Sequence, residues 1–104
     1  MSKEIGISPV VHNESKNRFE IEVGGQLAVA EYRRQGRRMI FTHTEVPPRF
    51  RGHGIAEKLV LEGFNVAQRE GLEIVAHCSY VAYVLQKHPE FRAARGAISP
   101  GSSD

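Results

Sequence analysis

Cysteine is almost absent from this chain of 104 residues, since Cys78 is its single cysteine. One cysteine excludes an intramolecular disulfide and a cysteine-rich zinc site. The histidines also lack a close pair at ligand spacing, so we expect no metal site. A free thiol is compatible with a reducing compartment.

Long hydrophobic runs are missing as well. No run approaches the roughly 20 residues that a membrane helix needs, and the first residues lack the apolar core of a signal peptide. We therefore expect no membrane partner and a cytoplasmic location. The net charge of +2 is mildly basic, which suits a phosphorylated ligand but does not by itself indicate nucleic acid.

The length fits one compact domain, and the hydrophobic share of 40% and the charged share of 25% are ordinary globular values. The tail after Phe91 is small and polar. We therefore expect one domain over residues 1–91 and a mobile tail over residues 92–104.

The first half of the chain predicts an antiparallel meander. Phe19, Ile21 and Val23 alternate with charged residues, which is typical of a half-buried strand over 18–23. Two glycines then indicate a turn into a second extended stretch over 26–33, and the polar turn 34–38 leads to a third strand over 39–46.

A strict period of two in the third strand places His43 and Glu45 on one face together with Met39 and Phe41. Pro47 and the proline after it cannot donate ladder hydrogen bonds, so the chain leaves the sheet there.

The second half predicts a helix, a strand and a helix. Apolar residues recur at three- and four-residue intervals from Ile55, and Gly71 indicates the end of that helix. Residues 72–77 predict a strand parallel to the third one, and Ser79 is expected to cap a short helix that ends before Pro89. The expected fold class is therefore α/β with a mixed sheet, built from a meander, a β-α-β crossover and a C-terminal helix.

The segment Arg51-Gly52-His53-Gly54-Ile55-Ala56 lies between the third strand and this helix. A helix N-terminus offers unpaired N–H groups and a partial positive charge, which favour a phosphate, and glycines let the backbone approach a ligand. The pattern is neither a Walker A motif nor a dinucleotide fingerprint, because Glu57 stands where the third glycine would be. The alternative is an ordinary strand-to-helix loop with solvated arginines.

The loop, the preceding "HTEV" of 43–46 and the "CSY" of 78–80 together resemble the GNAT superfamily of N-acetyltransferases, in particular a small single-domain group with a terminal "HPEF". The resemblance covers residues 12–91. It implies a minimal GNAT-like acyl-CoA N-acyltransferase fold whose two parallel strands splay apart around the pantetheine arm of acetyl-CoA or coenzyme A. It also implies a cofactor site formed by Val46, Arg51, Gly52, His53, Gly54, Ile55 and Ala56.

Acetyl transfer to an amine needs a base and an acid for the departing thiolate. The candidates are Glu45 and His43 as bases, with Tyr80 and Cys78 near the thioester, Cys78 either as an acid or as a nucleophile. The alternatives are solvated strand residues for the first two, helix packing for Tyr80 and Tyr83, and a small buried residue for Cys78.

The resemblance implies an acetyl-CoA-dependent N-acetyltransferase that acts on an unidentified amine, either a small molecule or a protein amine. A second hypothesis is a CoA-binding module with little or no catalytic activity, because the small group that the chain resembles lacks much of the N-terminal helical region that usually shapes the acceptor pocket. A third is a nucleic-acid binder that uses the basic turn "YRRQGRR" of 32–38, although such a cluster is usually a solvated hairpin tip.

Overall fold

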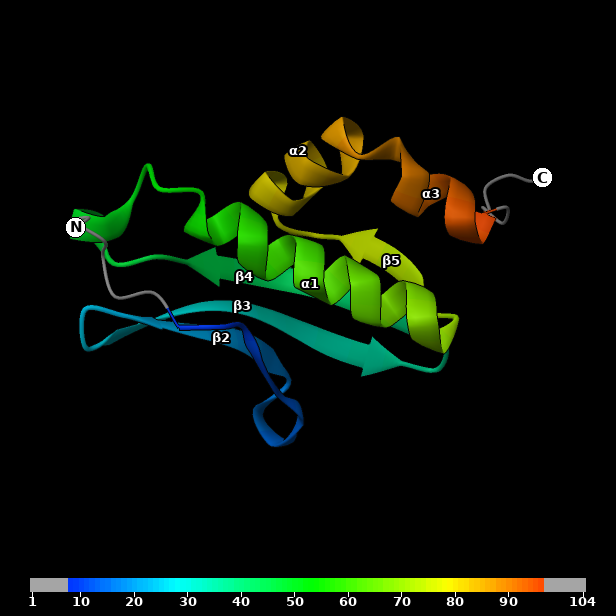
Figure 1. Ribbon diagram of the computed structural model, residues 1–104. Coiled ribbons are helices and arrows are strands. Elements are labelled where there is room, and N and C mark those ends of the chain that lie inside the picture. Colours follow the sequence, from blue (N-terminus) through cyan, green and yellow to red (C-terminus); the bar gives the residue numbers. More distant parts are fainter. Residues whose placement is uncertain (1–7, 97–104) are drawn as a thin grey trace.

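Five strands form one sheet in the order β1-β2-β3-β4-β5 in the computed structural model, which describes residues 8–96 (Figure 1). The first four strands pair antiparallel, and β5 pairs parallel with β4. This mixed sheet with its helices confirms the expected α/β fold class. The strands are β1 (Val11–Asn13), β2 (Arg18–Val23), β3 (Gln26–Gln35), β4 (Arg38–Glu45) and β5 (Glu73–Ala76). The helices are α1 (Ile55–Glu70), α2 (Ser79–Lys87) and α3 (Pro89–Gly96), with short 3-10 turns η1 (Glu14–Lys16) and η2 (Pro48–Phe50).

The strand β2 follows its sequence pattern. Phe19, Ile21 and Val23 are fully buried, and the charged residues between them lie on the other face of the sheet. The predicted meander is therefore confirmed. The sequence did not indicate β1, which adds three residues to the outer edge of the sheet.

The strand β4 contains an irregularity that corrects the expected assignment of its faces. Glu31 pairs with His43 and Tyr32 pairs with Phe41, so Thr42 is an extra residue without a partner in β3. An extra residue of this kind is a β-bulge, and it reverses the alternation of side chains beyond it. As a result, Met39 and Phe41 face the helices, whereas His43 and Glu45 lie on the opposite face.

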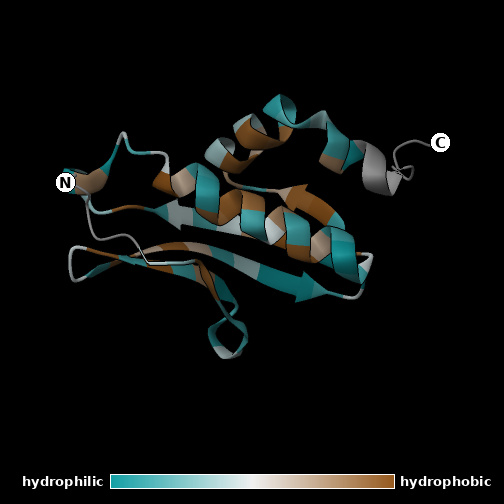
Figure 2. Ribbon diagram, viewed as in Figure 1, coloured by the Kyte–Doolittle hydropathy of each residue, from teal (hydrophilic) through white to brown (hydrophobic). Residues whose placement is uncertain are grey.

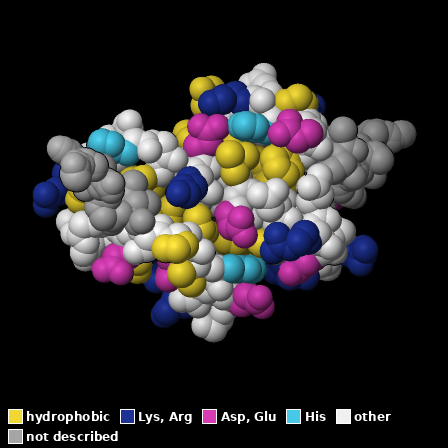
Figure 3. Space-filling model, in the orientation of Figure 1, with side chains coloured by type: hydrophobic (Ala, Val, Ile, Leu, Met, Phe, Trp, Pro, Cys, Tyr) yellow, Lys and Arg dark blue, Asp and Glu magenta, His cyan; other side chains and the backbone are white. Residues whose placement is uncertain are grey.

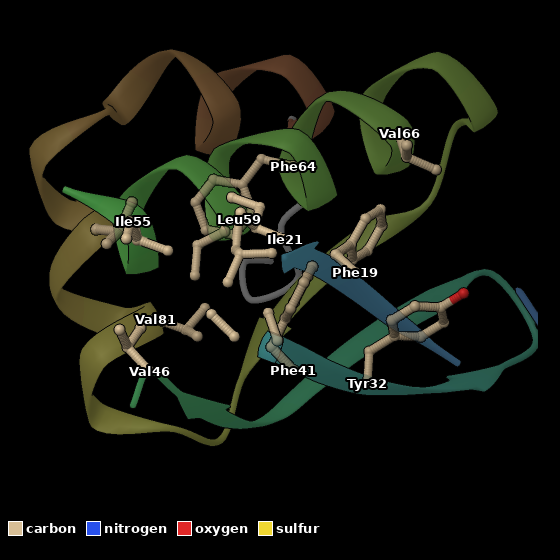
Figure 4. Close-up of a cluster of buried hydrophobic side chains, with 14 of the residues drawn as sticks. Phe19, Ile21, Tyr32, Phe41, Val46, Ile55, Leu59, Phe64, Val66 and Val81 are labelled. Carbon is tan, nitrogen blue, oxygen red and sulfur yellow. The ribbon is translucent and has the colours of Figure 1, made fainter. Parts of the chain in front are cut away.

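The three helices cover one face of the sheet (Figure 1). Hydrophobic and hydrophilic residues alternate around α1 (Figure 2), and the hydrophobic side packs against the strands. Figure 4 shows the resulting core, in which Phe41 and Phe64 meet edge to face at 5.5 Å between ring centroids. Val81 and Val84 of α2 belong to the same buried cluster. No helix of residues 8–96 packs on the opposite face.

Both ends of α1 match their prediction, because the helix begins at Ile55 and Gly71 ends it in the left-handed conformation that is common after a helix C-terminus. The start of α2 differs, since Cys78 and not Ser79 occupies the N-cap position. The sequence also did not indicate that α3 follows directly after His88. The expected domain boundary at residue 91 falls within α3, and residues 97–104 lie outside the described part, so the expected mobility of the tail stays a prediction.

Over residues 8–96, the structure has no helix with the length and apolar character that crossing a membrane would require.

Gly63 of α1 lies against two buried aromatic rings, and this contact yields a testable prediction. A Cβ atom at this position would lie 2.7 Å from the Phe41 ring and 3.1 Å from the Phe19 ring. Gly63→Val should therefore lower the free energy of unfolding by about 1–3 kcal/mol, because both rings are fully buried and the added side chain overpacks the core. Urea denaturation measures the change.

Asn65→Val is the matched control, because Asn65 is an exposed residue of the same helix. Equal stability losses in the two variants would show that the helix tolerates a β-branched residue equally well at both positions and would remove the close-packing account.

Candidate functional site

The candidate site lies at the C-terminal end of β4, beyond the point where this strand stops pairing with β5. The parallel pairing of β4 with β5 ends at Phe41 and Ala76, and the last ladder bond is donated by the His77 N–H to the Phe41 carbonyl over 2.9 Å. The strand β4 continues to Glu45. Its edge over residues 42–45 therefore has no strand partner on the β5 side among the described residues. The parallel pairing thus stops before the end of β4, which is where the resemblance implies that the two strands splay apart.

The glycine loop opens α1 without a side-chain cap. The first helical bond runs from the Lys58 N–H to the Gly54 carbonyl over 3.1 Å, so the N–H groups of Ile55, Ala56 and Glu57 precede the helical ladder. Gly52 and Gly54 have φ angles of +88° and +76°, and no heavy atom lies within 4 Å of a Cβ placed on either of them. The backbone is therefore open to a ligand on this side.

Two contacts hold the loop in place. The Phe50 ring packs so closely on the β2–β3 turn that a Cβ at Gly24 would overlap with it, and Phe50 itself is buried. The Nε–H of Arg51 donates a hydrogen bond to the Val46 carbonyl over 3.2 Å. The loop is thus fixed to the core on one side and to the end of β4 on the other.

A cavity of about 580 Å³ lies between the end of β4, the glycine loop and the first turn of α2. Its wall combines a strand end, a helix N-terminus and one tyrosine. The lining residues are His43, Thr44, Glu45, Val46, Phe50, Arg51, Gly52, Gly54, Ile55, Ala56 and Tyr80. All the expected cofactor residues except His53 therefore line one cavity, together with three of the four catalytic candidates. Thr44 and Phe50 are additional lining residues that the sequence did not indicate.

His43 and Glu45 touch each other at the mouth of this cavity. Nε2 of His43 lies 3.3 Å from Oε1 of Glu45, and the two side chains are 55% and 65% exposed. Because the bulge turns them away from Phe41, they do not have the apolar surroundings that the sequence suggested. The two side chains do lie on the same face of β4 as each other, as expected.

Tyr80 forms the opposite wall of the cavity. Burial raises the pKa of the Tyr80 phenol, and the nearby Glu57 carboxylate raises it further. The hydroxyl group therefore stays protonated at neutral pH. Tyr83, by contrast, is 52% exposed and does not line the cavity.

Cys78 lies behind the cavity wall, where its Sγ is 3.7 Å from Oγ1 of Thr44. Burial raises the pKa of the Cys78 thiol, but the backbone N–H groups of Val81 and Tyr80 and the Thr44 hydroxyl outweigh this effect, so the pKa is lower than usual. This is the environment of a thiol at a helix N-terminus. Thr44 reaches Cys78 only because the bulge turns it toward the helices.

Glu57 joins the start of α1 to the junction of α2 and α3. Its carboxylate lies 3.0 Å from Nε2 of His88 and 3.3 Å from Nζ of Lys87, and His88 is also 3.5 Å from Glu90. In Figure 3, acidic, histidine and cationic side chains gather over α2 and the start of α3. The hydrogen bond with His88 is the main cause that lowers the pKa of Glu57. His88 therefore connects helices as well as ending α2.

The basic turn between β3 and β4 is partly neutralised. Arg34 pairs with Glu70 at 3.6 Å, and Arg38 pairs with Glu73 at 3.6 Å. Within residues 8–96, no group of three or more histidine, cysteine or acidic side chains is arranged to hold a metal ion.

Comparison with known proteins gives a consistent result. A family model described as GCN5-related N-acetyl-transferase matches residues 18–94. Protein NATD1 of Mus musculus is 30% identical over 83 residues, which cover 77% of this chain and 76% of the mouse protein. Protein NATD1 of Homo sapiens is 30% identical over 77% of this chain and 74% of its own length, and that of Danio rerio is 29% identical over 77% and 76%.

The surroundings of Cys78 predict unusual thiol reactivity. Because the pKa of the thiol is lowered, the thiolate should form at a lower pH than in an ordinary cysteine, whose pKa is about 8.5. The rate of alkylation by iodoacetamide should therefore reach its half-maximal value at a lower pH in the folded protein than in the same protein unfolded in urea. Thr44→Val should move that midpoint upward, because it removes the hydroxyl that stabilises the thiolate.

Thr42→Val is the control, since Thr42 donates to the Glu31 carbonyl over 3.4 Å and not to the thiol. A midpoint in the folded protein at or above that of the urea-unfolded protein would contradict the lowered pKa.

Proposed function

Since the chain belongs to the GCN5-related N-acetyltransferase family, we propose that it transfers an acetyl group from acetyl-CoA to an amine. The observation that carries the proposal is the single cavity that joins the uncapped start of α1 to His43, Glu45 and Tyr80. One end of this cavity suits a pyrophosphate, and the other end carries groups that can move protons. The expected cytoplasmic location stays a prediction.

The chemistry of the loop fits the phosphates of coenzyme A. The N–H groups of Ile55, Ala56 and Glu57 are donors without helical partners, and the helix dipole adds partial positive charge. Arg51 and the exposed His53 add further cationic or titratable groups beside Gly52 and Gly54. We propose that these residues hold the pyrophosphate.

The remainder of the cofactor would lie along the free edge of β4. Backbone groups over residues 42–45 have no strand partner on the β5 side, so those that do not contact the Cys78 thiol are available to the amides of a pantetheine arm. Val46 is buried next to this edge and offers an apolar contact. Acetyl-CoA supplies an activated thioester, and the chain's own residues supply orientation and proton transfer.

The proton-transfer roles follow from position. Glu45 is exposed at the cavity mouth and would accept a proton from the acceptor ammonium group, directly or through water, while His43 at 3.3 Å orients it or shares that role. Tyr80 keeps its proton at neutral pH and would donate it to the departing thiolate.

Direct transfer is favoured over a route through Cys78. The thiol does not line the cavity and lies behind Thr44, so an acyl group could reach it only after a local movement. We therefore assign Cys78 a supporting role, in which the Thr44–Cys78 contact fixes the end of β4 against α2.

A second candidate function is a CoA-binding module with little or no activity. The exposure of His43 and Glu45 favours it, because a base works best where water is excluded. The two functions share the cofactor loop and differ in turnover.

Cofactor binding can be tested with Gly54→Trp. The added side chain would project into the open space beside the loop, so we expect the affinity for acetyl-CoA to fall by about tenfold or more. Gly36→Trp is the matched control, because Gly36 also has a positive φ of +57° and open space around it but lies in the β3–β4 turn. Isothermal titration calorimetry measures both. Equal affinities in the two variants would remove the loop from the proposed cofactor site.

Turnover separates the enzyme from the binding module. Glu45→Gln should lower kcat by about a hundredfold while the affinity for acetyl-CoA stays unchanged, because the amide cannot accept the proton. Glu62→Gln on α1 is the control. Release of free thiol from acetyl-CoA in the presence of an amine panel gives the rate. Full turnover in Glu45→Gln would rule out this base, and no turnover in the unaltered protein that binds acetyl-CoA would favour the module.

A further inference from the structure

The face of the sheet opposite the helices leads directly to the cavity mouth. The pairing register aligns Val11, Glu20, Val29 and Glu45 in one row across the first four strands. A second row aligns Asn13, Arg18, Glu31 and His43. Directly opposed residues share a face, so both rows lie on the open face and end at His43 and Glu45. We call this area the open-face surface and add to it the neighbouring pair Glu22 and Leu27.

This surface contains unusually exposed apolar side chains. Val11 and Leu27 are 55% and 47% exposed, and they are two of the three large hydrophobic residues so exposed among the described residues. Single exposed apolar residues are common on protein surfaces. Here, however, they share one sheet face with the half-buried Val29, which is next to Leu27 on β3 and is separated from Val11 by Glu20. A partner that covers them must bring apolar surface of its own.

The charge of the open-face surface is negative. Arg18 is already bound to Glu20 at 2.7 Å, whereas Glu22 and Glu31 have no cationic side chain within 4.0 Å among residues 8–92. Glu45 adds a third carboxylate at the cavity mouth. The other two arginines of this face, Arg33 and Arg38, lie toward the β3–β4 turn, and Arg38 is paired with Glu73.

The glycine loop on the other side of the cavity has the opposite charge. Arg49, Arg51 and Lys58 are exposed there, which suits a phosphorylated donor. Charges are thus separated across the cavity, with cations on the donor side and carboxylates on the acceptor side. An acceptor amine is cationic before it reacts, so the carboxylate side complements it.

We propose that the open-face surface binds an extended, basic polypeptide segment and presents one of its lysine side chains to Glu45. The inference rests on the proposed function, because it names the acceptor class of the same site. The charge complements a basic segment, and Val11 and Leu27 require apolar side chains between the cations. The surface spans β1 to β4, about 14 Å at the usual strand spacing, which an extended segment of about four residues covers.

The test measures binding separately from turnover. Isotope-labelled protein, with and without coenzyme A, is titrated with a short peptide in which one lysine is flanked by arginine and leucine, and backbone amide shifts are followed by NMR. We expect shifts at Val11, Glu22, Leu27 and Glu31 as well as at the cavity mouth. A peptide with glutamate in place of arginine should bind about tenfold more weakly or worse, and added salt should weaken binding of the basic peptide.

The double variant Glu22→Lys/Glu31→Lys should lose about tenfold in peptide affinity while its affinity for coenzyme A stays unchanged. Glu62→Lys/Glu70→Lys is the matched control, because it makes the same change of charge at two positions of α1 on the helix side. Leu27→Ser tests the apolar contribution and should also weaken binding of the basic peptide.

Several results would overturn the proposal. Equal losses of peptide affinity in the double variants Glu22→Lys/Glu31→Lys and Glu62→Lys/Glu70→Lys would show that net charge alone causes the effect. Shifts confined to residues 43–45, with spermidine binding as well as the peptide, would indicate a small amine as the acceptor. Concentration-dependent shifts at Val11 and Leu27 without peptide would show that a second copy covers this surface. Failure of coenzyme A to bind would instead remove the proposed function, and the peptide titration without coenzyme A would still decide whether the surface binds.

Discussion

The site depends on one feature of backbone pairing, namely that β4 is longer than its parallel partner β5. Pairing with β5 stops at Phe41, and residues 43–45 keep their pairing with β3 while their other edge has no strand partner among the described residues. An unpaired strand edge exposes hydrogen-bonding groups that require partners. Here the free edge forms one wall of the cavity, and α1 and α2 close the other walls.

The bulge at Thr42 determines which side chains meet at this free edge. Without the extra residue, His43 and Glu45 would point toward the helices, and Thr44 would lie on the open face. With it, Thr44 meets Cys78 between β4 and α2, while the histidine and the carboxylate reach the cavity mouth from the open face. The bulge therefore separates a packed contact from an exposed, titratable pair within three consecutive residues.

The core keeps this arrangement rigid through close aromatic contacts. Gly63 lets Phe41 pack against α1, and Gly24 lets Phe50 pack against the β2–β3 turn. Both contacts lie next to the segments that form the cavity. The bridge from Glu57 to His88 adds a polar connection between the start of α1 and the junction of α2 and α3. The residues that form the cavity are therefore held in place by contacts with the hydrophobic core and with the helix junction.

The sequence by itself determined the regular elements from β2 to α2 and the position of the glycine loop, but not β1 or α3. Alternation fixed the buried face of β2, and spacing fixed α1 from Ile55 to Gly71, because each pattern is local and its period identifies the structure. Only the tertiary structure decided the faces of residues 43–46, the cap at Cys78 and the neighbours of Thr44. A bulge depends on how β3 pairs with β4, and the contacts of α2 depend on where β5 ends, so neither leaves a periodic signal in the residues themselves.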